Sequence, residues 1–385
     1  MNILFLSSWY PTDKNPNFGV FVKEHAHAIH ATENKIVMLA IVIQRDNKIF
    51  ETKIIDKFDE LGMRVVLIEV NTIFRDIIYQ AIPIQYLLVK KVFKKRIHPD
   101  FRPDIIHSNV IFPAGIIGYW LSKYLNLPHI ITEHWSRIKG FISKPVLGGL
   151  ARKAYENASS ILPVSSFLKK NILEIIPTLP PSKLHVIGNV IDSKTFFYKE
   201  KNKPIDLIKF CAVATWTNKR IPDKMPEIFI EALAKLQEST QQMISLTMIG
   251  GGDRIEELKK LCVEMRLKTE FLGFQQKRMI AKILQESDYF VHASTIETFG
   301  VVVAESLICG TPVICSNVGA LPELIDETNG VLCENTVEDW VKGLKIAVNE
   351  KFDNNKISNN IEQKYSLIEI GKELHFVYSR TNKTM

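Results

Sequence analysis

The sequence lacks long hydrophobic runs and a cationic leader. None of its apolar segments approaches the roughly 18 residues that a membrane-spanning helix needs. At the amino terminus, Met1–Leu6 carries no positive side chain, and polar Ser7 and Ser8 follow too soon for a signal peptide. We therefore expect a cytoplasmic protein, with a peripheral position at the inner face of a membrane as the alternative.

Cysteine is scarce as well, and no two cysteines have the Cys-x-x-Cys spacing of metal and redox sites. All five fall in the second half of the chain, mostly within apolar patterns: Cys211, Cys262, Cys309, Cys315 and Cys333. This distribution is typical of buried thiols in a reducing cytosol, and it argues against a disulfide-bonded secreted protein.

A strong excess of charge of one sign is also missing. The formal net charge of +7 is modest for 385 residues, and the lysines are not interleaved with aromatic residues as they are in a nucleic-acid groove. Nucleic-acid binding is therefore not expected. The small positive surplus suits anionic small molecules or an acidic lipid surface.

The composition that remains is that of a soluble globular protein, with 46% hydrophobic and 24% charged residues. The length is sufficient for two domains, each with a full core. A charge-rich segment with little apolar content, Lys194–Lys203, marks the boundary. We place the domains at residues 1–193 and 204–364 and expect a helical tail at residues 365–385.

One stretch in the last third, Ser294–Val313, organises the functional prediction. A short apolar strand, Tyr289–Ala293, precedes it, and Pro312–Cys315 is a second strand, while the apolar residues between them have helical spacing. This pattern predicts a βαβ unit. Its strand-to-helix corner would lie at the carboxyl end of a parallel sheet, where open α/β folds bind ligands.

The corner has the features of an anion site. A helix that begins near Gly300 would present the free N–H groups of Phe299 to Val302 and the positive end of its dipole. Glu305 falls about five residues, or ~7.5 Å, into that helix, and Glu297 stays on the loop ahead of it. Two carboxylates would then bracket a phosphate. An ordinary corner capped by a glutamate is the alternative for an isolated pair of acids.

The residues around the acid pair carry a resemblance to a known family. Glu-x-Phe-Gly, a second glutamate at the eighth position, Gly-x-Pro-Val and Gly319–Glu323 stand in one register. Together they resemble the signature of retaining family-four glycosyltransferases of the GT-B type. The resemblance implies an α/β protein in which two Rossmann-like, doubly wound domains face a cleft, with the tail at residues 365–385 returning to the first domain.

The resemblance also implies roles for individual residues. In that family the first acid contacts the donor sugar, the second contacts the ribose, and backbone amides between them hold the diphosphate. These roles fall to Glu297, to Glu305, and to the backbone of Phe299, Gly300, Val301 and Val302. The donor substrate would be a nucleotide-diphosphate sugar, and no cofactor is expected.

Candidates in the first domain lie at the ends of strands. The loop that carries Gly19 is implied to face the donor phosphates and the acceptor. His107 and His134 each end a strand, and the resemblance gives His134 a contact with the donor hexose. His107 and Glu133 are predicted to face the acceptor. A strand-end histidine is also an ordinary hydrogen-bonded structural residue, which is the alternative for both histidines.

The second domain differs from the family in its positively charged side chains. Relatives place an arginine directly after the first strand and a lysine a few residues on, and both clamp the leaving diphosphate. This chain has Thr215 at the arginine position. Since a departing diphosphate needs positive charge, Lys219 or Arg220 is predicted to supply it, with Lys224 as a further candidate.

Two segments of the second domain are predicted to lie beside the nucleotide. Gly250 and Gly251 follow an apolar strand and form either a tight turn or a βα corner at the donor. Leu272 stands in a segment that resembles the one under the base in the family.

A basic amphipathic helix is predicted at residues 84–97. It follows strands near Ile36–Ile43 and Arg64–Val70, which a mobile, charge-rich connection joins. The helix is either a core helix with a solvated basic face or the seat of a peripheral enzyme on an anionic membrane, which a lipid-linked acceptor would require. Four lysines fall on one arc of this helix: Lys90, Lys91, Lys94 and Lys95.

The expected reaction is transfer of a hexose-type sugar to a glycan or lipid-linked acceptor in surface polysaccharide or glycoconjugate synthesis. No two aspartates stand at i and i+2, the arrangement that holds a metal in the other main glycosyltransferase fold, so we expect metal-independent transfer. Relatives retain the anomeric configuration, which implies attack on the leaving-group side. The alternatives are a GT-B sugar-nucleotide epimerase, a phosphorylase-like enzyme, or a non-catalytic sugar-nucleotide-binding scaffold, to which the Thr215 departure lends some support.

Overall fold

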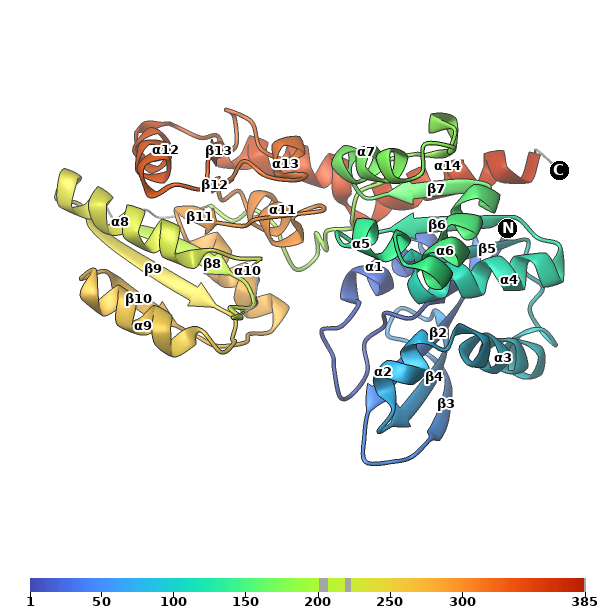
Figure 1. The fold of residues 1–385 in the computed structure, drawn as a ribbon. Helices are drawn as coiled ribbons and strands as arrows, with labels where there is room; N and C mark the ends of the chain where they lie inside the picture. The colour runs from blue at the N-terminus through green and yellow to red at the C-terminus, as the bar shows by residue number, and fades with distance from the viewer. Residues whose placement is uncertain (201–206, 219–222, 384–385) are drawn as a thin grey trace. The chain divides into compact units, whose positions relative to one another are not determined.

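The computed structural model describes residues 1–200, 207–218 and 223–383, which form two compact units (Figure 1). The first unit consists of residues 1–190 and 367–385, and the second consists of residues 191–366. No helix in the described part of the chain combines the length and the apolar character needed to cross a membrane.

The first unit is built on a seven-stranded sheet in the order β3-β4-β2-β1-β5-β6-β7, in which only β3 runs antiparallel to its neighbour. Strands β1 and β2 are almost wholly buried, because helices cover both faces of a doubly wound sheet. The strands are β1 (Asn2–Ser7), β2 (Lys35–Arg45), β3 (Glu51–Phe58), β4 (Arg64–Thr72), β5 (Ile105–Asn109), β6 (His129–Glu133) and β7 (Ser160–Pro163).

The last helix of the chain belongs to this unit. Helix α14 packs against α1, and its Tyr378 hydroxyl lies 2.6 Å from His107 Nδ1. The helices of the unit are α1 (Val20–His30), α2 (Arg75–Gln80), α3 (Ile82–Val92), η1 (Phe93–Ile97), η2 (Ile111–Gly115), α4 (Ile116–Leu125), α5 (Ile138–Ile142), α6 (Pro145–Asn157), α7 (Ser166–Ile175), η3 (Pro181–Lys183) and α14 (Leu367–Lys383).

The prediction of a mobile connection between the strands near Ile36–Ile43 and Arg64–Val70 is wrong. It contains β3, which forms an antiparallel hairpin with β4. Every residue of β3 is exposed except half-buried Ile55. Because neither face of the strand is buried, its sequence has no alternation of apolar and polar residues from which a strand could be predicted.

The second unit is built on a six-stranded parallel sheet in the order β10-β9-β8-β11-β12-β13. Its strands are β8 (Leu207–Val213), β9 (Met243–Ile249), β10 (Lys268–Phe271), β11 (Tyr289–His292), β12 (Val313–Ser316) and β13 (Gly330–Cys333). Its helices are α8 (Pro226–Thr240), α9 (Ile255–Glu264), α10 (Lys277–Glu286), α11 (Val301–Ile308), η4 (Leu321–Glu323), α12 (Val337–Asn349) and α13 (Asn354–Tyr365).

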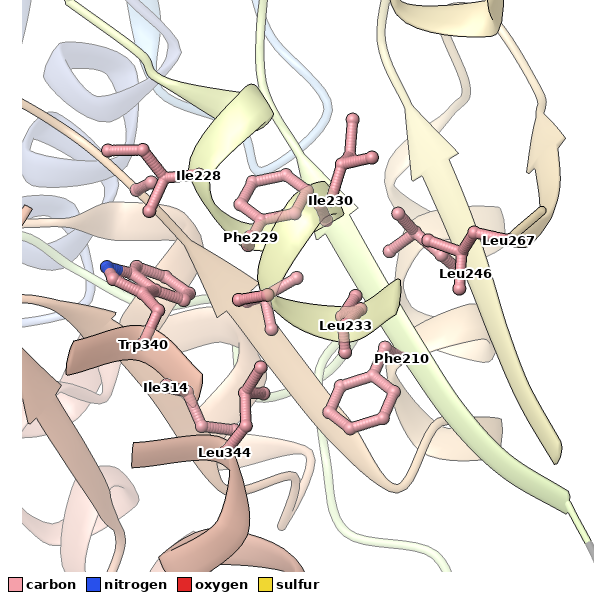
Figure 2. Close-up of a cluster of buried hydrophobic side chains, with 14 of the residues drawn as sticks. Phe210, Ile228, Phe229, Ile230, Leu233, Leu246, Leu267, Ile314, Trp340 and Leu344 are labelled. Carbon is pink, nitrogen blue, oxygen red and sulfur yellow. The ribbon is translucent and has the colours of Figure 1, made fainter. Parts of the chain in front are cut away.

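The core of the second unit lies between this sheet and helices α8 and α12. Figure 2 shows Phe229 of α8 and Trp340 of α12 among side chains from the sheet, and the rings of these two residues lie 6.0 Å apart. Helix α8 buries residues at helical spacing, so its sequence alone predicts this amphipathic packing. This core holds the carboxyl ends of the strands of the second unit in place.

Apart from β3, both sheets have the strand order of a doubly wound dinucleotide-binding fold. The order reverses between β1 and β5 in one unit and between β8 and β11 in the other. The predicted α/β class with two Rossmann-like domains is therefore confirmed. Ligands of such sheets bind at the carboxyl ends of the strands beside this switch point.

Candidate active site

The predicted βαβ corner of the second unit lies at its switch point. Strand β11 ends at His292, and the chain then turns into α11, which begins at Val301 with Gly300 as its N-cap. Gly300 has a φ of 92°, in the left-handed region, and a Cβ at this position would lie 2.8 Å from Leu321 Cδ2. The corner therefore requires glycine both for its backbone conformation and for its packing.

Glu297 is the centre of a polar cluster on this corner. Its carboxylate forms an ion pair with Lys224, and Oε1 lies 2.9 Å from His292 Nε2. Lys224 Nζ also lies 3.2 Å from that histidine nitrogen and 3.3 Å from Ser294 Oγ. The side chains of Glu297 and Lys224 keep 16% and 21% of their surface exposed, so both can reach a ligand.

Backbone pairing brings Lys224 to this position. Lys224 forms an antiparallel bridge with Ser294, and the N–H groups of Thr295 and Met225 donate to the carbonyls of Asp223 and Ala293. Sequence reasoning named Lys224 only as a further candidate and did not consider His292. The signal for His292 was its place at the end of a strand, the feature that singled out His107 and His134.

The electrostatics of the cluster keep Glu297 ionised. Burial alone would raise the pKa of Glu297, but Lys224 and His292 outweigh it and lower that pKa to about 2. Burial, helped by Lys224, lowers the pKa of His292, so its ring is neutral at pH 7. A neutral ring can either donate from Nε2 to Glu297 or accept from Lys224 at the same nitrogen.

Directly after Glu297, the start of α11 presents unused backbone donors. No described residue accepts a hydrogen bond from the N–H groups of Phe299, Gly300, Val301 or Val302. Glu305 follows farther along the helix and keeps 9% of its surface exposed. These donors, the helix dipole and the Lys224 ammonium together suit a diphosphate.

The other donor-side candidates of the second unit have packing roles. A Cβ at Gly250 would lie 1.8 Å from the Ala214 carbonyl oxygen, and one at Gly251 would lie 2.5 Å from the Phe274 ring. Both glycines thus let neighbouring loops close on the end of β9. Leu272, just after β10, donates its N–H to Met248 O at 3.0 Å.

The predicted replacements for the missing arginine, Lys219 and Arg220, lie outside the described residues. Thr215 follows the end of β8. In the part of the chain that the structure describes, no three His, Cys, Asp or Glu side chains come together as metal ligands would.

In the first unit, His134 lies at the carboxyl end of β6, beside polar groups from neighbouring strands. Its Nε2 lies 3.1 Å from Asn109 Oδ1 at the end of β5. Buried His134 Nδ1, Asn109 Nδ2 and Ser8 Oγ, which follows β1, have no partner among the described residues. Since buried polar atoms are rarely left unpaired, this strand end is a second candidate ligand site.

The His134 ring is neutral in this environment. Burial, with a contribution from the neighbouring His25 ring, holds the pKa of His134 well below its usual range. The two rings pack edge to face at 5.2 Å, and Phe21 of α1 lies against His134 from another side. His134 is therefore equipped to exchange hydrogen bonds with a hydroxyl and is a poor source of positive charge.

The structure places the remaining first-domain candidates in the framework. The prediction that His107 ends its strand is wrong, because β5 continues to Asn109. His107 is fully buried, and its Nε2 lies 2.7 Å from Thr132 Oγ1 while Nδ1 is bonded to Tyr378. Glu133 is also fully buried and accepts hydrogen bonds from Tyr155 and from three backbone N–H groups. Neither side chain has capacity left for an acceptor.

Gly19 is the left-handed N-cap of α1, with a φ of 72°. A Cβ on this residue would lie 2.4 Å from the carbonyl carbon of Trp9, so Gly19 allows the loop after β1 to fold back on itself.

Comparison with known proteins identifies related sequences over most of the chain. Residues 212–364 match the family described as Glycosyl transferases group 1, and residues 48–195 match Glycosyltransferase Family 4. Two uncharacterized glycosyltransferases of Methanocaldococcus jannaschii are similar to this chain. One is 28% identical over 77% of each chain, and the other is 30% identical over 71% of this chain and 75% of its own length.

Solved structures share the whole fold. Sucrose-phosphate synthase from Thermosynechococcus elongatus superposes with a TM-score of 0.75 at 17% identity and full coverage of both chains. Anabaena HepE, solved in complex with UDP, gives a TM-score of 0.72 at 17% identity over 99% of this chain and all of its own. These neighbours confirm the predicted GT-B fold class.

Proposed function

Because the chain belongs to the glycosyltransferases of group 1 and family 4, we propose that it transfers a hexose-type sugar from a nucleotide-diphosphate sugar to a glycan or lipid-linked acceptor. We further propose that transfer retains the anomeric configuration, needs no metal ion and serves the synthesis of surface polysaccharide or glycoconjugates. The observation that carries the proposal is the ion-paired Glu297 and Lys224 cluster directly ahead of the unused N–H groups of α11.

In this proposal the diphosphate of the donor binds at the start of α11. The N–H groups of residues 299–302 and the Lys224 ammonium hold its oxygens, Glu297 accepts hydrogen bonds from sugar hydroxyls, and Glu305 binds the ribose. The UDP complex of the structurally similar Anabaena protein supports a nucleoside diphosphate as the leaving group. Lys224 is thus the residue that compensates for Thr215.

The proposed chemistry needs charge stabilisation more than acid catalysis. The bond between the anomeric carbon and the leaving phosphate oxygen breaks while the acceptor hydroxyl attacks on the same face, and that phosphate oxygen takes the acceptor proton. Negative charge accumulates on the diphosphate, where fixed N–H dipoles and a cation stabilise it in the transition state. The unpartnered Nδ1 of His134 is proposed to bind a sugar hydroxyl.

A screen of nucleotide sugars tests this function. Thermal unfolding is measured with a panel of UDP-, GDP- and ADP-sugars, since a ligand that binds the folded state raises its stability. The donors that bind are then incubated with candidate acceptors and a chelator, and the anomer of the product is determined by NMR. Binding without turnover would instead support the scaffold, and conversion of the donor without an acceptor would support the epimerase.

The basic helix is proposed to seat the enzyme on an anionic membrane, where a lipid-linked acceptor would be found. The apolar face of α3 and η1 is buried, as for Val89 and Phe93, while Lys91, Lys94 and Lys95 are exposed. The Nζ atoms of Lys90 and Lys94 lie 3.6 Å and 5.0 Å from the centre of the Tyr124 ring.

Exposed apolar side chains also occur on this helix and on the helix before it. On α2 and α3, Ile77 and Leu87 keep 65% and 63% of their surface exposed. Lysines next to exposed apolar side chains are the combination that binds the interface of an acidic bilayer.

A further inference from the structure

The outer strand of the first unit, β3, has one edge that pairs with no described strand, and almost all of its residues are exposed. It is the terminal strand of the seven-stranded sheet, and among the described residues β4 alone pairs with it. Ile54 and Phe58 in the strand, and Phe50 directly before it, keep 42%, 70% and 45% of their surface exposed. An exposed edge strand that carries apolar side chains is a template for pairing with another chain.

The hydrogen bonding of the hairpin determines which backbone groups of β3 are available. Asp59 N–H donates to Met63 O, which makes residues 59 and 63 a hydrogen-bonded pair at the turn. Hydrogen-bonded pairs alternate along an antiparallel ladder, so the odd-numbered residues of β3 bond to β4. The N–H and C=O groups of Thr52, Ile54 and Asp56 therefore point away from the sheet.

From this geometry we propose that β3 is a self-association edge that pairs antiparallel with β3 of a second copy of this chain, centred on Ile54. A two-fold axis that relates identical edges makes their strands antiparallel. Only registers that place even-numbered residues opposite even-numbered residues use the available groups on both strands. Pairing Ile54 with its own counterpart is such a register, and it joins the two sheets into one.

The side chains of β3 match this register. Opposite residues have numbers that add to 108, so Phe50 lies opposite Phe58 of the second copy, and Ile54 lies opposite Ile54 on the same face. On the other face, Glu51 lies opposite Lys57. Cross-strand apolar pairs and pairs of opposite charge each contribute roughly 0.2–1 kcal/mol, and the two-fold axis supplies both outer pairs twice.

The neighbouring registers bring like charges together. A shift that centres the pairing on Ile55 places Lys53 opposite Lys57 and Glu51 opposite Asp59. A shift that centres it on Lys53 places two copies of this lysine opposite each other. Like charges directly opposite each other destabilise a sheet, so the charge pattern of β3 selects the register centred on Ile54 and a second copy as the partner.

Analytical ultracentrifugation of the full chain over a concentration series tests the proposal. Since an edge of eight residues is smaller than the interfaces of about 1,600 Å² that stable complexes bury, we expect a reversible monomer–dimer equilibrium. Ile54→Lys places two lysines at the two-fold axis and is expected to weaken the dimer about tenfold or more. Ile346→Lys is the matched control, because Ile346 is an exposed isoleucine of the second unit, with 58% of its surface accessible.

A charge swap tests the register itself. Lys57→Glu places two glutamates opposite each other on both sides of the axis and is expected to weaken the dimer, and Glu51→Lys is expected to do the same with two lysines. The double variant restores both pairs and with them the association. A chain that stays monomeric at every concentration, or a dimer that responds equally to Ile54→Lys and Ile346→Lys, would overturn the proposal.

Cysteine cross-linking gives a second readout. Opposite Cα atoms of a hydrogen-bonded antiparallel pair are about 5.5 Å apart, within the range that a disulfide spans. Ile54→Cys is therefore expected to form a covalent dimer on mild oxidation. Phe58→Cys should not, because the two copies of residue 58 lie eight strand positions, or ~27 Å, apart in this register. The five native cysteines are buried and give little background. Equal cross-linking of both variants would rule out the register.

Discussion

At the residue scale, Glu297 depends on its partners for its charge. Without Lys224 and His292, burial would favour the neutral acid, which could not accept hydrogen bonds at both oxygens. Only the ionised carboxylate can accept hydrogen bonds from sugar hydroxyls at both of its oxygens. The cluster therefore acts as one unit, in which the basic residue maintains the state of the acidic one and offers its own charge to the diphosphate.

Replacing Glu297 or Glu305 tests the role of each carboxylate in the reaction apart from its role in folding. Glu297→Ala is expected to abolish transfer while the chain still folds, with a lower melting temperature because Lys224 and His292 lose their partner. Glu305→Ala should chiefly raise the KM for the donor. Activity assays with circular dichroism melts check both variants. Wild-type turnover by Glu297→Ala would contradict the assignment.

The pH dependence follows from the lowered pKa of Glu297. A carboxylate with a depressed folded-state pKa contributes stability above its unfolded pKa and loses it only as the pH falls through the folded value, here about 2. Glu297 therefore stays ionised throughout the mildly acidic range. The acidic limb of the wild-type activity profile should come from other groups.

Removing the Lys224 ammonium is expected to raise the pKa of Glu297. In Lys224→Met, burial acts on Glu297 with only His292 to oppose it, so the pKa of Glu297 is expected to rise by about 1–3 units and its titration to enter the acidic limb of kcat/KM. The readout is the pH profile of donor turnover. Lys235→Met, which removes an exposed lysine of α8, is the control and should leave the profile unchanged. Identical profiles for both variants would show that Lys224 does not control Glu297.

At the scale of elements, α11 owes its position to the left-handed glycine that starts it. Gly300 turns the chain into the helix three residues after Glu297, so the first N–H groups of α11 follow that residue directly. A second glycine, Gly319, packs against the backbone of Glu297, where a Cβ would lie 2.1 Å from its carbonyl oxygen. The loop between β11 and α11 is therefore held by close packing of Gly300 against the Leu321 side chain and of Gly319 against the Glu297 backbone.

Gly300→Ala tests this dependence. The substitution places a Cβ in the left-handed region and 2.8 Å from Leu321, so we expect a loss of about 1–3 kcal/mol in unfolding free energy together with weaker donor binding. Gly62→Ala is a matched control, because Gly62 has a φ of 78° with no atom within 4 Å of its Cβ position. Denaturant unfolding and donor titration of both variants measure the difference. Equal stability losses would mean that the packing against Leu321 is unimportant.

The two sheet edges of the first unit differ in their exposure. Strand β7 is wholly buried, whereas β3 is almost wholly exposed. An edge strand is normally protected by charges, and β3 carries four charged residues. Their order along the strand disfavours pairing in neighbouring registers while leaving one antiparallel register open, which is why the proposed association is specific.

At the scale of the whole molecule, the proposed membrane seat predicts a dependence on lipid charge. The chain is expected to sediment with vesicles that contain acidic phospholipid and to remain in solution with neutral ones, and added salt should weaken binding because it screens the attraction. Lys91→Glu with Lys95→Glu should reduce sedimentation several-fold, whereas Lys259→Glu with Lys282→Glu on the second unit should not. Equal binding to neutral vesicles would exclude an electrostatic seat.

Many strands, most helices and the acid pair could be predicted from the sequence because each of them is encoded in a short local pattern. The buried strands are continuous apolar runs, the helices have helical spacing, and the acid pair stands in one short segment with Gly300 between its members. These features depend on neighbouring residues along the chain. For that reason the α/β class and the corner at Gly300 followed from the sequence pattern, and the GT-B fold followed from the family resemblance of that segment.

Tertiary structure alone decided which distant residues meet. Lys224 reaches Glu297, 73 positions away, through a backbone bridge to Ser294 that no local pattern encodes. His107 and His134 were both predicted at strand ends, yet His107 lies in the middle of β5 with both nitrogens bonded, whereas His134 follows β6 and keeps an unpartnered nitrogen. Strand β3 left no pattern in the sequence because neither of its faces is buried. The physical reason is the same in each case: register and burial are properties of packed elements, and a single sequence specifies them only through the complete fold.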